Sequence, residues 1–489
     1  MKNKFLYFLH LNRDKILLIF FLYIFATCSV GVVNYPYIDD IARRVEGVGN
    51  FAAHYSRYLS EYASYVVQGS HHLTDTGLTT FVLSAIILTI SSALVLYVLF
   101  KGKKVSWISA LGSIFIGINP WFIECLSFRF DAPYICLSVL CSVLPFILYE
   151  SKAINYFMLS VVGVFLMCNS YQGSSGIFII MLLTLLYRDY IENSSIFELI
   201  KKAVLSGGAY AVAMLVYFVE TKFNPELTLR GDTTSIAKLG EMPYAIYNNL
   251  KVYFLTLKSQ STHLWLFLAI ILITSTIIFG IKKSKKTKLL SAATSIVYVI
   301  VCSVMSLGVY MFFSTPLASV RPRYEYGFAF FIGILMIMLA ETTSSKLADY
   351  LKGCVVILLT YYSLSFSFIY ASALDIQKES FEYGSEMLAS DLNNYLTDEN
   401  KVVYISSLFK DSPAYLNTQS TYPILGSLIP SNTSLYWPNL LWFKTYTSLN
   451  IDLIGFDFNS INMNDLELKE SNKLWDIYKY NGEIYVYIK

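Results

Sequence analysis

Charged residues are scarce in this sequence. Lysine, arginine, aspartate and glutamate make up 15% of the 489 residues, whereas hydrophobic residues make up 55%. A soluble protein of this length needs more polar surface than this composition supplies, so the balance is typical of a protein embedded in lipid. The net charge is only +3. The basic residues lie between apolar runs and do not gather on one face, which excludes nucleic acid as a partner.

Disulfide and metal-binding patterns are missing as well. The seven cysteines lie within or beside apolar runs, and their spacing fits neither a disulfide framework nor a zinc site. The adjacent His71 and His72 have no third ligand at metal spacing. We therefore predict no firm cofactor. A divalent cation held by Asp39 and Asp40 is the one alternative that the sequence leaves open.

What the sequence does contain is a series of long apolar runs. A helix needs about 20 residues to cross a bilayer core of about 30 Å, and about eleven runs approach that length. We predict an all-α polytopic membrane protein with about 11 transmembrane helices, the first retained as an anchor. The candidate spans lie near 15–33, 78–100, 106–122, 134–149, 154–169, 175–187, 203–220, 264–281, 289–312, 327–341 and 353–372.

The distribution of basic residues predicts the orientation of these spans. Lysines and arginines gather in alternate connecting loops, with the densest cluster at 282–286. The positive-inside rule places these loops in the cytoplasm. The N-terminus is then cytoplasmic, and an odd number of spans puts the C-terminus outside.

Three outer segments are long enough to have structure of their own: 34–76, 221–262 and 373–489. We divide the chain into a transmembrane catalytic domain at 1–372 and an outer C-terminal domain at 373–489. The latter shows a helical pattern near 375–396 and a strand pattern at 401–406, and an Asn481-Gly482 pair between apolar runs near its end predicts a hairpin. We predict a small α+β domain.

The first outer loop carries an acidic pair, Asp39 and Asp40, with Arg43 and Arg44 one turn later. Adjacent carboxylates near apolar surroundings lose hydration and repel each other. A structural interpretation has Asp39 capping a short helix from Asp40 to Glu46. A functional interpretation has a carboxylate acting as a general base at the outer end of the first span.

Two further outer turns combine charged, amide and aromatic groups. Arg129 and Asp131 lie two residues apart on either side of Phe130, where they can form a local ion pair or the guanidinium can hold a phosphate. Tyr171 and Gln172 lie at the outer end of the fifth span. These two side chains can hydrogen-bond a sugar, and helix-end capping is the structural alternative.

A third outer turn, before the tenth span, contains Arg321 and Arg323. Arginines on the outer side run against the positive-inside tendency, so orientation does not account for them. Two guanidiniums can hold the phosphate of a lipid-linked substrate and stabilise charge on a departing phosphate. Ordinary headgroup binding is the alternative.

Together these segments resemble the bacterial, often phage-encoded, O-antigen glucosyltransferases of serotype conversion, which belong to the GT-C class of polytopic glycosyltransferases. The resemblance rests on Asp39-Asp40-Ile-Ala-Arg43 with Ser56-Arg57-Tyr58-Leu59, on Arg129-Phe130-Asp131 leading into Leu-Ser-Val-Leu-Cys-Ser-Val-Leu-Pro145, and on Tyr171-Gln172. It covers roughly the first 200 residues.

The resemblance implies an inner-membrane enzyme that moves glucose from polyprenyl-phosphate-glucose to a sugar hydroxyl of lipid-linked O-antigen on the periplasmic face. It implies an acidic base in the first outer loop, here Asp39 or Asp40, with Asp39 the first choice, and direct displacement with inversion. We assign the donor phosphate to Arg129, Arg321 and Arg323. The residues expected to contact the substrates are Arg43, Arg57, Asp131, Tyr171 and Gln172.

Two other classes of membrane protein remain as alternatives. A lipid-linked oligosaccharide flippase or other transporter would carry ionisable residues at mid-depth in its spans, whereas the charges here gather at span ends. An O-antigen polymerase also has a large outer loop. The acidic pair directly after the first span argues against it.

Overall fold

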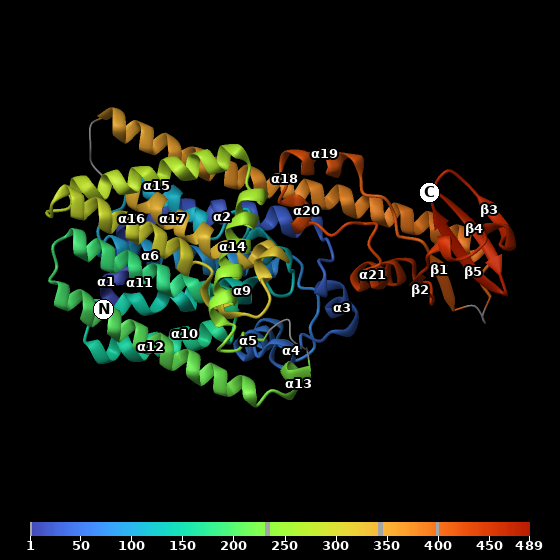
Figure 1. Cartoon of the computed structure of the whole chain (residues 1–489), viewed down its shortest axis with the longest axis horizontal. Coiled ribbons are helices and arrows are strands. Elements are labelled where there is room, and N and C mark those ends of the chain that lie inside the picture. Colours follow the sequence, from blue (N-terminus) through green and yellow to red (C-terminus); the bar gives the residue numbers. More distant parts are fainter. Residues whose placement is uncertain (1, 230–234, 341–345, 398–400) are drawn as a thin grey trace. The chain divides into compact units, whose positions relative to one another are not determined.

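The structure is a computed structural model that describes residues 2–229, 235–340, 346–397 and 401–489 (Figure 1). Helices make up most of it, with one small sheet near the C-terminus. The chain divides into two compact units. The first, the helical unit, comprises Met1–Val32 and Val48–Ile369, and the second, the tail unit, comprises Val33–Gly47 and Tyr370–Lys489. Residues 33–47 of the first outer loop therefore group with the tail.

The α-helices that begin in the helical unit are α1 (Lys2–Leu11), α2 (Arg13–Val33), α4 (Phe51–Tyr55), α5 (Tyr58–Gln68), α6 (Thr79–Leu99), α7 (Trp107–Ser113), α8 (Ile123–Ser127), α9 (Ala132–Val143), α10 (Ala153–Cys168), α11 (Ser175–Ile191), α12 (Ile196–Lys222), α13 (Pro225–Leu229), α14 (Met242–Gln260), α15 (His263–Lys283), α16 (Lys288–Met305), α17 (Tyr326–Ala340) and α18 (Lys346–Asn393). Its 3-10 turns are η1 (Ile114–Ile116), η2 (Leu144–Leu148), η3 (Gln172–Ser174), η5 (Gly308–Phe312), η6 (Leu317–Ser319) and η7 (Pro322–Tyr324).

Within the described residues, each predicted apolar run falls on an apolar helix; residue 341 of the predicted run 327–341 lies outside them. Seven of the described helices are long and apolar enough to cross a membrane, by length and composition: α2, α6, the η3–α11 segment, α12, α15, α16 and α18. The remaining four runs are shorter apolar helices at Trp107–Ile116, Ala132–Leu148, Ala153–Cys168 and Tyr326–Ala340. These helices indicate a membrane protein, and the number of spans stays a prediction.

Many hydroxyl groups inside the apolar helices donate to nearby carbonyls, although those of Thr80 and Ser160 have no hydrogen-bond partner within the described residues. In α6, the hydroxyl of Ser84 donates to the Thr80 carbonyl at 2.8 Å, and that of Thr89 donates to the Ala85 carbonyl at 2.7 Å. Between helices, the Tyr23 hydroxyl of α2 and the Ser92 hydroxyl of α6 lie 2.8 Å apart. Such bonds matter because an unsatisfied polar group in an apolar surrounding is costly.

Small residues let three helices approach closely around one backbone group. A Cβ at Gly327 in α17 would collide with the carbonyl oxygen of Ser306. A Cβ at Gly176 in α11 would lie 2.7 Å from the same oxygen, which follows the end of α16. Glycine at these positions therefore permits the packing that surrounds the candidate site below.

The helix α18 is longer than expected. The predicted span at 353–372 and the predicted helix at 375–396 form one continuous helix of 48 residues. At about 1.5 Å per residue it is about 72 Å long, more than twice the apolar thickness of a bilayer. Its residues belong to the helical unit up to Ile369 and to the tail unit from Tyr370.

The tail unit combines short helices with a five-stranded mixed sheet. Its helices are α3 (Asp39–Glu46), α19 (Pro413–Thr421), α20 (Leu425–Leu428) and α21 (Trp437–Thr447), with 3-10 turns η8 (Phe458–Ser460) and η9 (Met463–Asp465). Its strands are β1 (Val402–Ile405), β2 (Asp452–Gly455), β3 (Glu467–Ser471), β4 (Trp475–Tyr480) and β5 (Glu483–Ile488). The strand order is β2-β1-β5-β4-β3, with β1 parallel to β2 and β5 and the other pairs antiparallel.

Buried aromatic side chains form the core of the tail unit. Trp442 stacks on Phe381 of α18 at 4.3 Å between ring centroids and meets Tyr35 edge-on at 5.2 Å. The indole N–H of Trp475, which is 1% exposed, donates to Asp391 at 2.9 Å. Tyr35 precedes α3, so this segment of the first outer loop is part of the same core.

The predicted hairpin is confirmed. Tyr480 and Glu483 are the last paired residues of β4 and β5, and the two residues between them, Asn481 and Gly482, have φ values of 49° and 85°. A two-residue turn with both central φ values positive matches the right-handed twist of the strands, and asparagine and glycine tolerate that region best.

We predict that Gly482→Ala lowers stability by about 1 kcal/mol, because an alanine Cβ is strained at positive φ. The measurement is the melting temperature of the purified full chain in detergent, with limited proteolysis of the tail at rising temperature. Gly240→Ala is the control, since its Cβ would meet no atom of the described residues within 4 Å and its φ is not in the positive region. Equal melting and proteolysis of the two variants would contradict the turn assignment.

Candidate functional site

A cluster of polar side chains lies within the helical unit where α10 leads into α11. The guanidinium of Arg57 is 4.7 Å from the ring centroids of both Tyr55 and Tyr171. Its Nε donates to Oε1 of Gln172 at 3.1 Å, and Nε2 of Gln172 donates to the Tyr55 carbonyl at 3.0 Å. Arg57 and the adjacent pair Tyr171 and Gln172, which were predicted from two different segments of the sequence, are thus in direct contact.

The two arginines before α17 share a buried carboxylate. Nη1 of Arg323 lies 3.0 Å from Oε1 of Glu124, and the backbone N–H of Arg323 donates to Oε2 at 2.8 Å. Nε of Arg321 lies 4.0 Å from Oε1. The Glu124 side chain is fully buried, whereas those of Arg321 and Arg323 are 22% and 20% exposed. One carboxylate therefore faces two guanidiniums.

Tyrosines connect these two groups. Arg57 and Arg323 both act electrostatically on the phenol of Tyr310, which is buried. Burial raises the pKa of the Tyr171 phenol, and the positive charge of Arg323 lowers it to a smaller extent. The Tyr171 hydroxyl is buried and has no hydrogen-bond partner among the residues that the structure describes. We name Arg57, Tyr171, Gln172, Tyr310, Arg323 and Glu124 the arginine–tyrosine cluster.

Glu325 adds a second carboxyl group beside this cluster. It is fully buried, and neither carboxyl oxygen has a hydrogen-bond partner within the described ranges. Burial raises the pKa of Glu325 well above its usual range, and the nearby charge of Glu124 raises it further. Glu124 and Glu325 are thus both buried but have different environments. Glu124 is paired with arginine, whereas Glu325 has no charged partner among the described residues.

Arg129 and Asp131 lie in the same unit and are both buried. Nε of Arg129 donates to Oδ1 of Asp75 at 2.6 Å, and Nη1 donates to the Gly31 carbonyl at 2.9 Å. Asp131 holds the N-cap position of α9, and its backbone carbonyl accepts hydrogen bonds from Tyr134 and Ile135. The phosphate and substrate roles of these two residues stay predictions.

The acidic pair belongs to the tail unit. Asp40 is fully buried, whereas the Asp39 side chain is 31% exposed and lies 3.8 Å from Nη2 of Arg43. The proposed cap is wrong, because α3 begins at Asp39 and Ile38 holds the N-cap position. Ile38 has φ 47°, an unusual conformation for a β-branched residue.

Contacts within the tail unit hold this acidic segment in place. The Tyr37 hydroxyl donates to the Leu428 carbonyl at 2.6 Å, and Nζ of Lys378 in α18 donates to the Val33 carbonyl at 3.0 Å. Helix α3 packs against α21. The strained backbone at Ile38 is therefore surrounded by fixed contacts, which is how such strain persists in folded proteins.

The structure thus brings five predicted residues into one region of the helical unit: Arg57, Tyr171, Gln172, Arg321 and Arg323. Asp39, Asp40 and Arg43 share α3 of the tail unit. Within the described residues, no group of three or more His, Cys, Asp or Glu side chains could hold a metal ion.

Glu124 and Glu325 were not among the residues predicted from the sequence. A signal for Glu124 was present, because it is an isolated acid in the otherwise apolar stretch Ile123–Ser127. Glu325 directly precedes the apolar helix α17. An ionisable residue next to long apolar runs is costly without a partner or a function.

The comparison with known protein families gives a match over well over half of the chain. The profile described as glucosyl transferase GtrII matches residues 28–338. This chain belongs to the GtrII glucosyltransferase family. The match includes both the acidic segment and the arginine–tyrosine cluster, and membership supports a glycosyltransferase role.

One relative among curated proteins is an uncharacterised 55.3 kDa protein from the region 5′ of gtrB in Salmonella phage P22. It is 25% identical over 182 residues, which are 37% of this chain and 37% of the relative. The alignment therefore spans little more than a third of either protein. No solved structure matches.

We predict that Glu325→Gln reduces the pH dependence of stability. Below the ordinary glutamate pKa of about 4.3, the carboxyl group is protonated in both the folded and the unfolded chain. As the pH rises from there to the raised pKa of the folded state, the unfolded chain loses its proton more readily, so stability falls. Melting temperatures of the purified chain across this pH range should fall more for the native protein than for the variant.

Glu124→Gln is the matched comparison for Glu325→Gln. Loss of a fully buried ion pair costs about 3–5 kcal/mol, and we expect about 1–3 kcal/mol because the Arg323 side chain is 20% exposed. This variant should therefore melt lower than the native protein at neutral pH, whereas Glu325→Gln should not. The reverse order of stability would refute the two assigned environments.

Proposed function

We propose that this chain is a polyprenyl-phosphate-sugar-dependent glucosyltransferase of the bacterial inner membrane. It moves glucose from polyprenyl-phosphate-glucose to a sugar hydroxyl of lipid-linked O-antigen on the periplasmic face. The N-terminus is cytoplasmic and the C-terminal domain periplasmic. The observation that carries the proposal is the arginine–tyrosine cluster, because its two guanidiniums, amide and phenols are the groups that bind a phosphate and a sugar.

The arginines have distinct roles in this proposal. Arg321 and Arg323 bind the donor phosphate, and Glu124 holds both guanidiniums in position. Arg57 is held between two aromatic rings, so little side-chain entropy is lost when it meets substrate. The same positive charge stabilises the phosphate as it departs.

The reaction is a single displacement with inversion at the anomeric carbon. The acceptor hydroxyl loses its proton to Asp39, and its oxygen forms the new bond to the anomeric carbon. The bond from that carbon to the phosphate oxygen breaks, and polyprenyl phosphate leaves with the electron pair. We favour Asp39 over Asp40 as the base because the Asp39 side chain is 31% exposed and Asp40 is fully buried.

We predict that Asp39→Asn lowers kcat by about 10²- to 10⁴-fold, the usual contribution of a general base. Asp40→Asn should mainly lower the melting temperature, since it changes a buried group. The assay offers polyprenyl-phosphate-glucose and lipid-linked O-antigen to the purified chain and counts glucose transferred per folded molecule.

The control for the Asp39 and Asp40 variants is Asp452→Asn, an exposed carboxylate at the start of β2, which should leave transfer unchanged. Full transfer by both Asp39→Asn and Asp40→Asn would remove the base assignment. If the native chain transferred no sugar from any phosphosugar lipid and instead moved such lipids across vesicle membranes, the transporter alternative would replace the proposal.

Acceptor recognition is the role that we propose for an exposed aromatic pair in the tail unit. Trp442 and Trp475 are core residues, whereas Trp437 and Tyr436 are 41% and 44% exposed with ring centroids 5.9 Å apart. Exposed aromatic faces suit stacking on sugar rings.

We predict that Trp437→Ala raises the acceptor KM about two- to tenfold, which corresponds to a stacking energy of about 0.5–1.5 kcal/mol. The donor KM should stay the same. Leu416→Ala is the control, because Leu416 is a similarly exposed apolar residue, at 48%, in α19 of the same unit. Equal acceptor KM values for the two variants would exclude this surface.

A further inference from the structure

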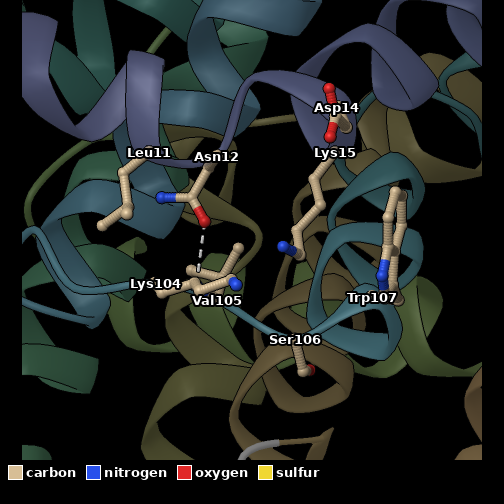
Figure 2. A pocket seen from close by; sticks show the side chains of 8 residues that line it. All are labelled: Leu11, Asn12, Asp14, Lys15, Lys104, Val105, Ser106 and Trp107. Atoms are coloured by element: carbon tan, nitrogen blue, oxygen red, sulfur yellow. Dashed lines mark hydrogen bonds between the residues drawn. The ribbon is translucent and has the colours of Figure 1, made fainter.

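A polar cavity lies in the helical unit, away from the residues assigned so far. It opens between the junction of α1 and α2 and the segment that precedes α7, and its volume is about 430 Å³ (Figure 2). The side chains that line it are Leu11, Asn12, Asp14, Lys15, Lys104, Val105, Ser106 and Trp107. The sequence predicts that this end of the helices faces the cytoplasm, so the cavity is separate from the proposed transfer site.

Lys15 is the most informative residue that lines this cavity, because lysine is seldom buried and this residue is only 6% exposed. Its ammonium group lies 5.0 Å from the centroid of the Trp107 ring. Within the part of the chain that the structure describes, this ammonium group makes no hydrogen bond and no ion pair with a carboxylate. A buried ammonium group without an anion is costly, since desolvation disfavours its charge.

The nearest acidic side chain does not supply the missing anion. Asp14 lines the same cavity, but its Oδ1 lies 3.5 Å from Nε of Arg13, and both side chains are more than 70% exposed. In Figure 2 the Asp14 carboxylate points away from the space between Lys15 and Lys104. The cavity therefore carries two ammonium groups against one solvated carboxylate.

The cavity wall is fixed before any ligand arrives. Asn12 is 1% exposed, and its Nδ2 donates to the Phe8 carbonyl at 3.1 Å. Its Oδ1 accepts a hydrogen bond from the backbone N–H of Val105 at 3.0 Å. This amide ties the turn between α1 and α2 to the segment that carries Lys104 and Trp107. A preformed site loses little entropy on binding.

We propose that this cavity binds a phosphate group, with Lys15 and Lys104 as its counter-charges and the Trp107 indole against the attached organic part. A phosphate presents several oxygens to two ammonium donors, and lysine binds phosphate as a compact point charge. The cavity is larger than a single phosphate needs, which leaves room for a headgroup or a small organic phosphate. The phosphate comes from an anionic phospholipid or from a free phosphate compound.

Two experimental arms distinguish these sources, and neither depends on glucose transfer. In one, the purified full chain in a neutral detergent is titrated with inorganic phosphate while tryptophan fluorescence is followed. In the other, its melting temperature is compared in nanodiscs of phosphatidylcholine alone and with added phosphatidylglycerol. Lys15→Gln, Lys104→Gln and the double variant are measured beside the native chain. Lys103→Gln is the matched control, because Lys103 is exposed and does not line the cavity.

A free-phosphate site predicts saturable binding of phosphate and at least a fivefold weaker apparent Kd in both single variants. A lipid site predicts that phosphatidylglycerol raises the melting temperature of the native chain and of Lys103→Gln but not of the double variant. Lys104→Gln keeps the test valid if Lys15→Gln fails to fold, since Lys104 is exposed. If the variants and the native chain respond alike in both arms, the proposal is wrong.

Discussion

The ion pair between Glu124 and Arg323 is the interaction on which the candidate site depends. Both carboxylate oxygens of Glu124 are used, one by the guanidinium and one by the backbone N–H of Arg323, in a position closed to solvent. The pair joins α8 to the segment before α17, which lies 199 residues further along the chain. Because a buried carboxylate is costly without a partner, this contact fixes where that segment lies. The positions of Arg321 and Glu325 follow from it.

The same constraint explains the distribution of the other polar groups in the helical unit. Serine and threonine hydroxyls in the apolar helices donate to carbonyls one turn earlier, and tyrosines bridge neighbouring helices. Buried polar groups without a hydrogen-bond partner in the described ranges occur at several places, Thr80 and Ser160 among them. Two of these groups, the Tyr171 hydroxyl and the Glu325 carboxyl, lie beside the arginines. A polar ligand would satisfy such groups, as the proposed donor would.

Family membership and geometry support the proposal in different ways. The GtrII match indicates the general kind of reaction, and it covers both the acidic segment and the arginine–tyrosine cluster. The geometry distinguishes between residues that had looked alike in sequence. Arg323 shares a buried carboxylate and retains an exposed edge, whereas Arg129 is bound to Asp75 and a backbone carbonyl. Asp39 and Asp40 differ in the same way, since one is partly exposed and the other buried.

The sequence by itself determined the features that depend on local composition. Apolar runs predicted the membrane helices because burying a helix in lipid requires about 20 such residues, and the Asn481-Gly482 pair predicted its hairpin because few residues tolerate positive φ. It also picked out Arg57, Tyr171 and Gln172, although not their mutual contact. Only the tertiary structure decided that Glu124 pairs with Arg323, that Glu325 lies desolvated and that Ile38, not Asp39, holds the N-cap position of α3. The physical reason is that burial and charge pairing arise between segments far apart in the chain, where no local pattern records them.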